Sequence, residues 1–130
     1  MRSPTIISSL AALLLVGTIP VADAASLSGT WHGSGFVNPS SGNREKVRCR
    51  ITYRRQSKKV FHVSAVCAST SGKIRQTGQL LMVNTKRYIG DFYNSDFDIS
   101  GRVRVLLRGT RQTVSFSSPS GHGRITLRKR

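Results

Sequence analysis

Acidic side chains are rare in this 130-residue sequence, which has 5 Asp and Glu residues against 21 Lys and Arg and a net charge of +16 at pH 7. Most basic side chains therefore lack an acidic partner within the chain, and the resulting field favours anionic partners without specifying a fold. The carboxylates are also too scattered for a metal centre, since only Asp96 and Asp98 share one face of a predicted strand. We expect no metal and no cofactor.

Long apolar runs are absent except near the N-terminus, where Leu10–Val16 follows Arg2 and precedes the small-residue sequence Ala22-Asp23-Ala24. This order of segments is typical of a cleavable signal peptide, which we assign to residues 1–24. Its removal takes away one base and one acid and leaves the net charge at +16. Residues 25–130 have the length of a single domain, which we expect to be periplasmic or secreted.

Cysteine and histidine are scarce as well. Cys49 and Cys67 are the two cysteines, and in an exported chain an even number favours a disulfide over a redox or metal site.

A ribonuclease mechanism needs two histidines at one phosphate. His32 and His122 lie near the starts of the first and last predicted strands, which would run antiparallel and place them at opposite ends. No G-x-S-x-G nucleophile motif is present, so we expect a non-enzyme.

A period of two between apolar and polar residues predicts β-strands. It is clearest at Val47–Arg54 and returns at Arg102–Val105 and Arg124–Arg128. Short strands joined by hairpin-length links predict an all-β antiparallel up-and-down meander that closes into a small eight-stranded barrel, with a two-sheet β-sandwich as the alternative. Turn residues separate eight candidate strands, at residues 29–37, 46–55, 60–68, 73–82, 87–93, 97–107, 111–117 and 122–128.

Strand parity also predicts which side chains fill the interior. One run departs from parity, because Leu80–Val83 has no polar side. This run is either buried on both faces or part of a surface contact, and we prefer ordinary packing. The predicted inward residues are Trp31, Val47, Cys49, Ile51, Tyr53, Phe61, Val63, Ala65, Cys67, Val103, Val105, Val114, Phe116, Ile125 and Leu127.

The opposite parity carries arginine. In a closed meander the last strand lies beside the first, so that arginines of the last, first and second strands share one outer side. We predict that this face binds an anionic envelope polymer or lipid headgroups. Most aromatic residues point inward, with Tyr88, Phe92 and Tyr93 as exceptions, so we expect no sequence-specific nucleic-acid partner. The predicted ligand-binding residues are Arg48, Arg50, Arg54, Arg102, Arg104, Arg124 and Arg128.

The start of the first strand, Leu27-Ser28-Gly29-Thr30-Trp31, contains a G-x-W that resembles the first strand of lipocalin and avidin barrels. In those families the Trp closes one barrel end beneath a basic side chain of the last strand. The resemblance implies that role for Arg128 or Lys129, as a cation–π contact with Trp31.

A second resemblance is to small periplasmic bacterial barrels that inhibit metalloproteases. Similar segments are Ser26–Trp31, Cys49–Ile51, Val63–Cys67 and the basic tail Ile125–Arg130. That family inserts the residues before its barrel into the protease cleft. The resemblance therefore implies a protease as partner and an inhibitory N-terminus made of Ala25, Ser26 and Leu27.

Together these observations predict an exported, basic, disulfide-bonded binding protein that contacts a polyanion through its arginine face. A protease inhibitor is the alternative, and a small basic nuclease is the weaker alternative. We expect a monomer that does not span the membrane once the signal peptide is removed, because an eight-stranded lumen has no room for this many arginines.

Overall fold

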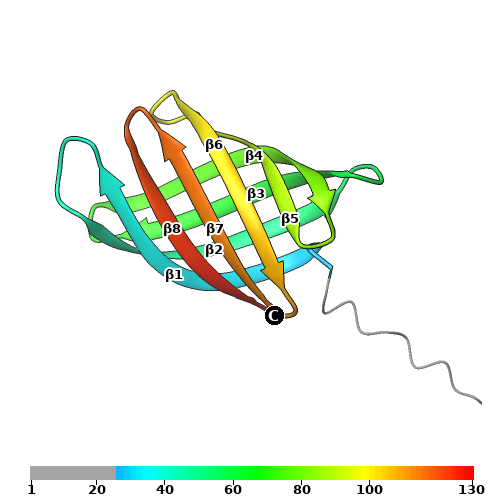
Figure 1. Cartoon of the computed structure of the whole chain (residues 1–130). Helices are drawn as coiled ribbons and strands as arrows, with labels where there is room; N and C mark the ends of the chain where they lie inside the picture. The colour runs from blue at the N-terminus through cyan, green and yellow to red at the C-terminus, as the bar shows by residue number, and fades with distance from the viewer. Residues whose placement is uncertain (1–25) are drawn as a thin grey trace, which may run out of the picture.

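The computed structural model describes residues 26–130; the predicted signal peptide and Ala25 lie outside them. Each strand pairs antiparallel with the next, and β1 also pairs with β8, so the barrel is closed (Figure 1). The predicted fold class is confirmed and the sandwich alternative is wrong. No helix in residues 26–130 is both long and apolar enough to cross a membrane. The strands are β1 (Gly29–Pro39), β2 (Glu45–Arg55), β3 (Val60–Ser69), β4 (Gly72–Asn84), β5 (Arg87–Asn94), β6 (Ile99–Arg108), β7 (Arg111–Ser118) and β8 (Gly121–Lys129).

Glycines allow neighbouring strands to fold over one another at the corners of the barrel. Strands β6–β8 cross β2–β4 steeply (Figure 1), so the sheet bends where β1 meets β8 and where β4 meets β5. A Cβ atom on Gly33 would lie 1.9 Å from Thr126 O, and one on Gly90 would lie 1.9 Å from Gln79 O. These obstacles are backbone atoms that no side-chain rotation can move, so glycine is required at both corners.

The predicted disulfide is present. Cys49 and Cys67 face each other directly in the register of β2 and β3, and their sulfurs are bonded. Closing a loop with a sequence separation of 18 stabilises a fold by about 3 kcal/mol in the chain-entropy model. A structural disulfide is typical of proteins in oxidising, non-cytoplasmic compartments.

Every residue of the predicted interior is buried or packs against the buried core. Two expectations about aromatic residues were wrong, because Tyr88 and Phe92 point inward with exposed fractions of 2% and 9%. They share a parity on β5, whereas Tyr93 has the other parity and is 45% exposed. The missed signal was that shared parity, which is obscured by Gly90 at an inward position and by the apolar residue Ile89 at an outward one.

The apolar run on β4 alternates after all. Leu80 is 1% exposed and Met82 packs against the core, while Leu81 and Val83 are 50% and 52% exposed. Ordinary packing, the preferred interpretation, therefore holds for half of the run, and the other half is surface.

One strand begins later than predicted. β6 starts at Ile99 rather than residue 97, because Asn94 Oδ1 accepts hydrogen bonds from the backbone amides of Asp96 and Phe97. Asp98 then has a positive φ of 51°, which suits a turn and not a strand. Phe97 is left in the turn with 63% of its surface exposed.

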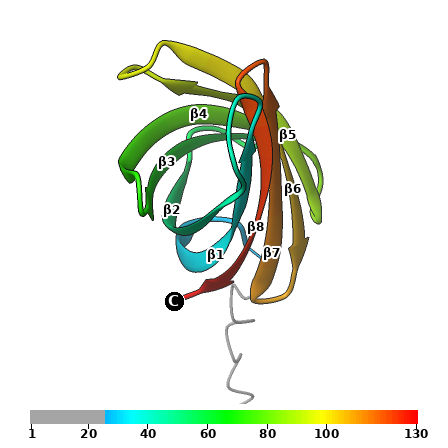
Figure 2. The same ribbon diagram turned by 90° about the vertical axis from the view of Figure 1, so that its left-hand side faces the viewer.

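The barrel has two unlike ends. At one end lie the turns β2–β3, β4–β5 and β6–β7 together with Ser26–Ser28 and the C-terminus; we call it the closed end because side chains seal it. At the other, the open end, lie the turns β1–β2, β3–β4, β5–β6 and β7–β8 (Figure 2). Near the open end several inward side chains, including Val37, Val103 and Phe116, are only partly buried.

The corner glycines provide a test of barrel closure. Gly33→Ala should lower the free energy of unfolding by roughly 3 kcal/mol or more, because the added methyl group meets the β8 backbone. Gly42→Ala is the matched control: the nearest atom to its new Cβ is 3.9 Å away, so its stability should change by less than about 0.5 kcal/mol. Denaturant unfolding measures both, and equal stability of the two variants would contradict this account of closure.

Candidate functional site

Five outward-facing residues on five neighbouring strands form a line of basic side chains, which we call the arginine row. The register pairs Arg108 with Arg111, Arg111 with Arg128, Arg128 with His32, and His32 with Arg50. With about 4.8 Å between strands, the row spans roughly 19 Å across β6–β7–β8–β1–β2. The four arginines are exposed and His32 is partly exposed.

The arginine row contains like charges directly opposite each other, an arrangement that destabilises a sheet. No acid lies within it. Within residues 26–130 the one arginine–carboxylate ion pair joins Arg102 Nε to Asp91 Oδ1 at 3.9 Å, and both side chains are about four-fifths exposed (81% and 79%). Such an exposed pair contributes little to stability, and it does nothing to neutralise the row.

A second group of cations lies closer to the open end. Arg104 and Arg124 both face Ser115 across the register, and Arg124 and Lys46 both face Phe36. Between this group and the arginine row runs a strip of hydroxyl side chains, Ser34, Thr126 and Thr113, with Arg48 at its β2 end and Leu106 at its β6 end. An anionic group bound at this strip could accept charge-assisted hydrogen bonds from the guanidinium groups and neutral hydrogen bonds from the hydroxyl groups between them.

A groove opens on the outer surface where β1 and β2 meet. Its cationic and imidazole side chains are His32, Arg48, Arg50, Lys73 and Arg130. Two of these belong to the arginine row, so the row is continuous with a concave surface. Concave basic surfaces concentrate anions more strongly than convex ones do.

The structure separates the predicted ligand-binding residues into two sets. Arg48, Arg50, Arg104, Arg124 and Arg128 lie on the shared face, as the register above shows. Arg54 does not join it, because it lies beyond the start of β1 and faces His62 on β3. Arg102 lies at the margin of the shared face, where it lines a groove with Arg104 and Arg124 and pairs with Asp91.

Sequence reasoning missed three members of the arginine row: Arg108, Arg111 and His32. The signal for the arginines was available, because Arg108 and Arg111 flank a two-residue turn at Gly109-Thr110 and must therefore face each other. His32 was considered only as a catalytic group and not as a neighbour of Arg50 and Arg128.

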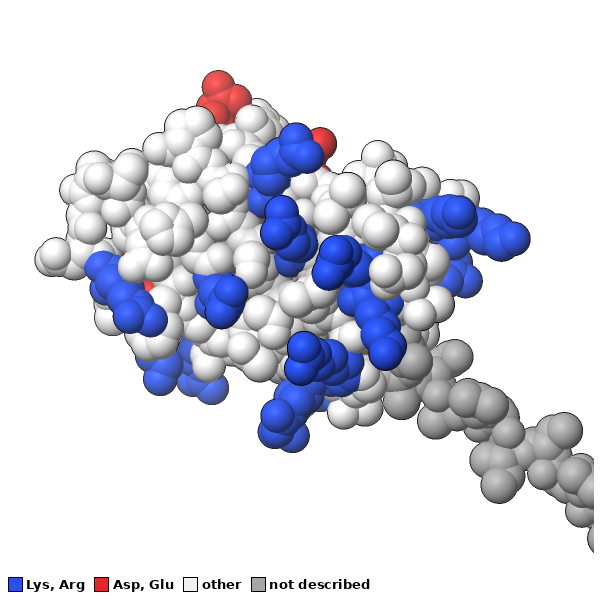
Figure 3. Space-filling model, in the orientation of Figure 1, with Lys and Arg blue, Asp and Glu red and all other residues white. Residues whose placement is uncertain are grey.

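Charge is distributed unevenly along the barrel axis. The described acids belong to the open end and the half of the barrel next to it: Glu45 starts β2, Asp91 lies in the second half of β5, and Asp96 and Asp98 lie in the β5–β6 turn. In Figure 3 the blue side chains extend over the front strands and the closed end and also reach the left margin, while the red ones lie only at the upper and left margins. The cations at the closed end are Arg54, Arg55, Lys58, Lys59, Lys86, Arg87, Arg108, Arg111, Arg128, Lys129 and Arg130.

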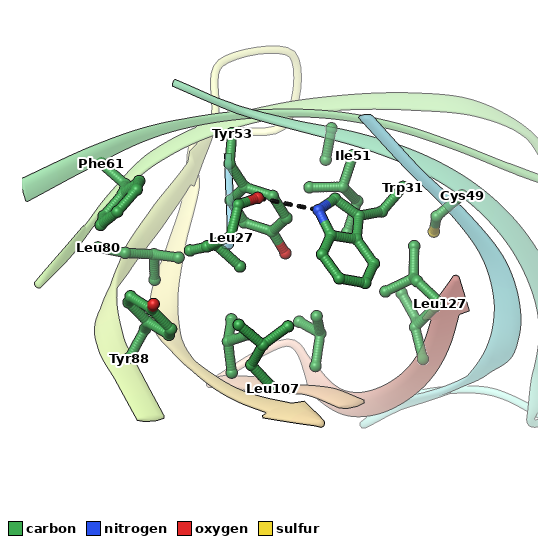
Figure 4. Close-up of a cluster of buried hydrophobic side chains, with 14 of the residues drawn as sticks. Leu27, Trp31, Cys49, Ile51, Tyr53, Phe61, Leu80, Tyr88, Leu107 and Leu127 are labelled. Carbon is green, nitrogen blue, oxygen red and sulfur yellow. Dashed lines mark hydrogen bonds between the residues drawn. The ribbon is translucent and has the colours of Figure 1, made fainter. Parts of the chain in front are cut away.

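The closed end is sealed by the residues that precede β1. Leu27 is 1% exposed and lies between Trp31, Tyr53 and Leu80 (Figure 4). Trp31 Nε1 donates a hydrogen bond to Leu27 O at 2.9 Å, and Lys129 Nζ donates one to Ser26 O at 2.9 Å. Lys129 Nζ also lies 5.7 Å from the centre of the Trp31 ring, so Lys129 and not Arg128 occupies the place that the G-x-W resemblance implied.

The interior is almost entirely apolar. It contains a cavity of about 110 Å³ lined by inward-facing residues, including Val47 on β2, Val63 on β3 and Phe92 on β5. Two buried side chains are joined by a hydrogen bond of 2.5 Å from Tyr53 Oη to Gln112 Oε1, and Gln112 Nε2 has no partner among the described residues. Burial raises the pKa of Tyr53 far above its ordinary value, so this phenol stays protonated.

The histidines do not meet. Along β1, His32 faces Arg128, whereas His122 faces Asn38 near the other end of the strand, and His62 faces Arg54 on β2. The paired histidines that the nuclease alternative requires are therefore not assembled. No group of three or more His, Cys, Asp or Glu within residues 26–130 is placed to hold a metal ion.

Comparison with known proteins supports the fold and no family. The sequence matches no protein-family model and no curated protein sequence. Similar solved structures include a redesigned β-barrel, mFAP1, bound to DFHBI (15% identity, 82% of this chain and 97% of that chain, TM-score 0.66). Others are a de novo designed fluorescence-activating β-barrel (18%, 85% and 99%, 0.64) and Rv2717c from M. tuberculosis (13%, 85% and 98%, 0.58).

The seal at the closed end distinguishes a structural from an inhibitory N-terminus. Leu27→Ala should lower the free energy of unfolding by about 2–5 kcal/mol, because it removes a buried side chain from a packed core. Ser26→Ala should cost less than about 1 kcal/mol, since it keeps the backbone carbonyl that binds Lys129 and loses only the hydrogen bond that Ser26 Oγ accepts from Ser28 N at 3.3 Å. Thermal and denaturant unfolding measure both. If Leu27→Ala left stability unchanged, Leu27 would not belong to the core, and a recognition role for the N-terminus would gain support.

Proposed function

We propose that this protein is an exported, non-enzymatic binding protein that contacts anionic envelope components, whether glycolipid, acidic polysaccharide or another polyanion, through the arginine row and the cations around it. The observation that carries the proposal is the register of the row. Directly opposed arginines without acids cost stability. A local arrangement that opposes folding and has no compensation within the chain is typical of a functional surface.

The chemistry of the row suits phosphate, sulfate or carboxylate groups. Guanidinium forks bind such oxyanions in two-pronged geometry, and adjacent arginines at strand spacing would contact successive charges of a polymer. The surface aromatics needed to stack nucleic-acid bases are few on this face, where Phe36 is already covered by the guanidinium group of Arg44 at 3.8 Å. We therefore favour a polyanion of the envelope over a nucleic acid.

Two features of the chain support an exported location. The disulfide between Cys49 and Cys67 suits an oxidising compartment, and the predicted signal peptide would direct the protein there. A periplasmic or secreted location would bring the cationic surface to anionic envelope material. The designed barrel bound to DFHBI is a binding protein on a similar fold, which supports a binding role only in general terms.

The protease-inhibitor alternative stays a prediction that the arrangement of the N-terminus does not favour. A residue that enters a protease cleft has to be accessible, and Leu27 is 1% exposed beneath the hydrogen bond from Trp31. Ser26 is held through its carbonyl by Lys129. No observation at this end of the molecule points to a protease as partner.

Affinity for immobilised heparin tests the proposal. Arg111→Gln with Arg128→Gln removes two charges from the row and should reduce the slope of log affinity against log salt by about two, because fewer counterions are released on binding. The same variant should be slightly more stable than the wild type, because two like-charge contacts are relieved.

The matched control is Arg54→Gln with Lys58→Gln, which removes two exposed cations outside the row and outside the cation group beside it. It should change the salt dependence by less than half as much. Equal loss in the two double variants would show that total charge and not the row determines affinity. Absence of heparin binding by the wild type at low salt would refute the proposed function.

A further inference from the structure

Four exposed apolar side chains lie together on three neighbouring strands. Leu81 and Val83 on β4 are 50% and 52% exposed, Ile89 on β5 is 37% exposed and Leu106 on β6 is 38% exposed. Leu81 and Ile89 face each other directly in the register. Isolated exposed apolar residues are ordinary, but a contiguous group on a soluble domain marks a contact surface. We call these four residues the apolar patch.

The other large exposed apolar residues have different surroundings. Phe36 lies under the guanidinium group of Arg44. Tyr93 and Phe97 belong to the open end, where Tyr93 Oη donates a hydrogen bond to Asp98 Oδ1 and Phe97 lies between Asp96 and Asp98 in sequence. The apolar patch is therefore set apart by its place, in the half of β4–β6 nearest the closed end.

A bulge lies within the patch. The pairing of β4 with β5 shifts register between Met82 and Asn84, which leaves Val83 as an extra residue in β4. Met82 still packs against the core while Val83 turns outward. Val83 shares the outward parity of Leu81, so alternation along β4 already turns it outward, and the bulge leaves it without a directly opposed residue on β5.

Arginines are interleaved with the apolar patch. Arg87 faces Leu106 across β5–β6, and Arg104 faces Ile89. The next outward residue on β5 is the exposed Asp91, whose Oδ1 lies 3.9 Å from Arg102 Nε, so a cation also stands beside the acid nearest the patch. Toward the closed end the patch continues into Lys86 and into Arg108 of the arginine row.

We infer that the apolar patch and its interleaved arginines form a docking face for an anionic lipid bilayer. This inference rests on the proposed function and commits it to a lipid among the polyanions considered. Leucine, valine and isoleucine insert at the boundary between headgroups and acyl chains, while arginines bind the headgroup phosphates. A second copy of this chain is a poor occupant, because it would bring the same arginines and the same net charge of +16 against the patch. Docking in this orientation also places Asp96, Asp98 and Glu45, at the open end, away from the anionic surface.

Cosedimentation with vesicles of phosphatidylglycerol and phosphatidylcholine, compared with retention on heparin, tests the inference. The double variant Leu81→Thr with Ile89→Thr removes the exposed apolar surface of two patch residues. Threonine also favours β-strands, so the strands should still form. Vesicle affinity at physiological salt should fall by about tenfold or more. Heparin retention should stay the same, because no charge changes.

Tyr93→Thr with Phe97→Thr is the matched control, since these residues are similarly exposed (45% and 63%) but lie at the acidic open end. It should leave both affinities unchanged. Unchanged vesicle affinity in the patch variant would overturn the inference and leave the proposed function standing. A wild-type protein that binds heparin but not vesicles would have the same consequence. Failure of the wild type to bind either would refute both. If size-exclusion chromatography showed that the wild type is a dimer and the patch variant a monomer, the partner of the patch would be a second copy of the chain and not a lipid, and the inference would be overturned.

A second pair of variants keeps the test informative if the double variants fold poorly. Leu81→Trp places an indole in the patch, whereas the native Trp31 is fully buried. On addition of anionic vesicles its emission should shift to shorter wavelength and be quenched by brominated lipid, which reports insertion of the side chain. Phe97→Trp should show neither change. Identical responses from the two variants, or none from either, would contradict docking through the patch.

Discussion

Closure of the barrel requires the backbone of β8 to lie directly against the inner face of β1, at a distance that only glycine permits. A Cβ atom on Gly33 or Gly35 would meet a β8 carbonyl oxygen at 1.9 Å. This contact fixes the register of β1 with β8, and that register sets Arg128 opposite His32 and thereby two strands from Arg50. The same pairing brings Lys129 over Trp31 and onto Ser26. The cationic face and the sealed end therefore both depend on one close approach of two strands.

The closed barrel gives the molecule an inside that stabilises the fold and an outside that partly opposes it. Inside, apolar side chains from all eight strands and the buried Leu27 form one core, with a disulfide across β2 and β3. Outside, arginines face arginines with little carboxylate to balance them. An anionic partner would remove this repulsion, so binding and stability should rise together. The described acids lie toward the open end, where Arg44, Lys46 and Lys73 also lie, so the excess of positive charge is greatest toward the closed end and orients the protein relative to an anionic surface.

Much of this fold could be predicted from the sequence because a half-buried strand reveals itself by its period of two. Val47–Arg54 predicted both the core of β2 and its basic outer face, and the predicted disulfide followed from the two cysteines on adjacent strands. Residues outside the regular alternation escaped prediction. Leu27 precedes the first strand and enters the core through a hydrogen bond to Trp31, and Gly33 and Gly35 matter through atoms of β8 that are distant in sequence. The site was predicted only in part. The alternation along a strand shows which side chains face outward, but the pairing register between strands decides which of them become neighbours. Arg111 therefore belongs to the row and Arg102 does not.

The central claim is that the arginine row is held together against its own repulsion, and the dependence of stability on salt tests it most directly. Urea is uncharged and does not screen, so the free energy of unfolding can be measured in urea while sodium chloride is raised from about 0.02 M to about 0.15 M, which shortens the screening length to about 8 Å. The account predicts that stability rises with salt, and that Arg111→Gln with Arg128→Gln rises less than the wild type. A wild-type stability that is flat or falls with salt, or an equal rise in the row variant, would contradict it.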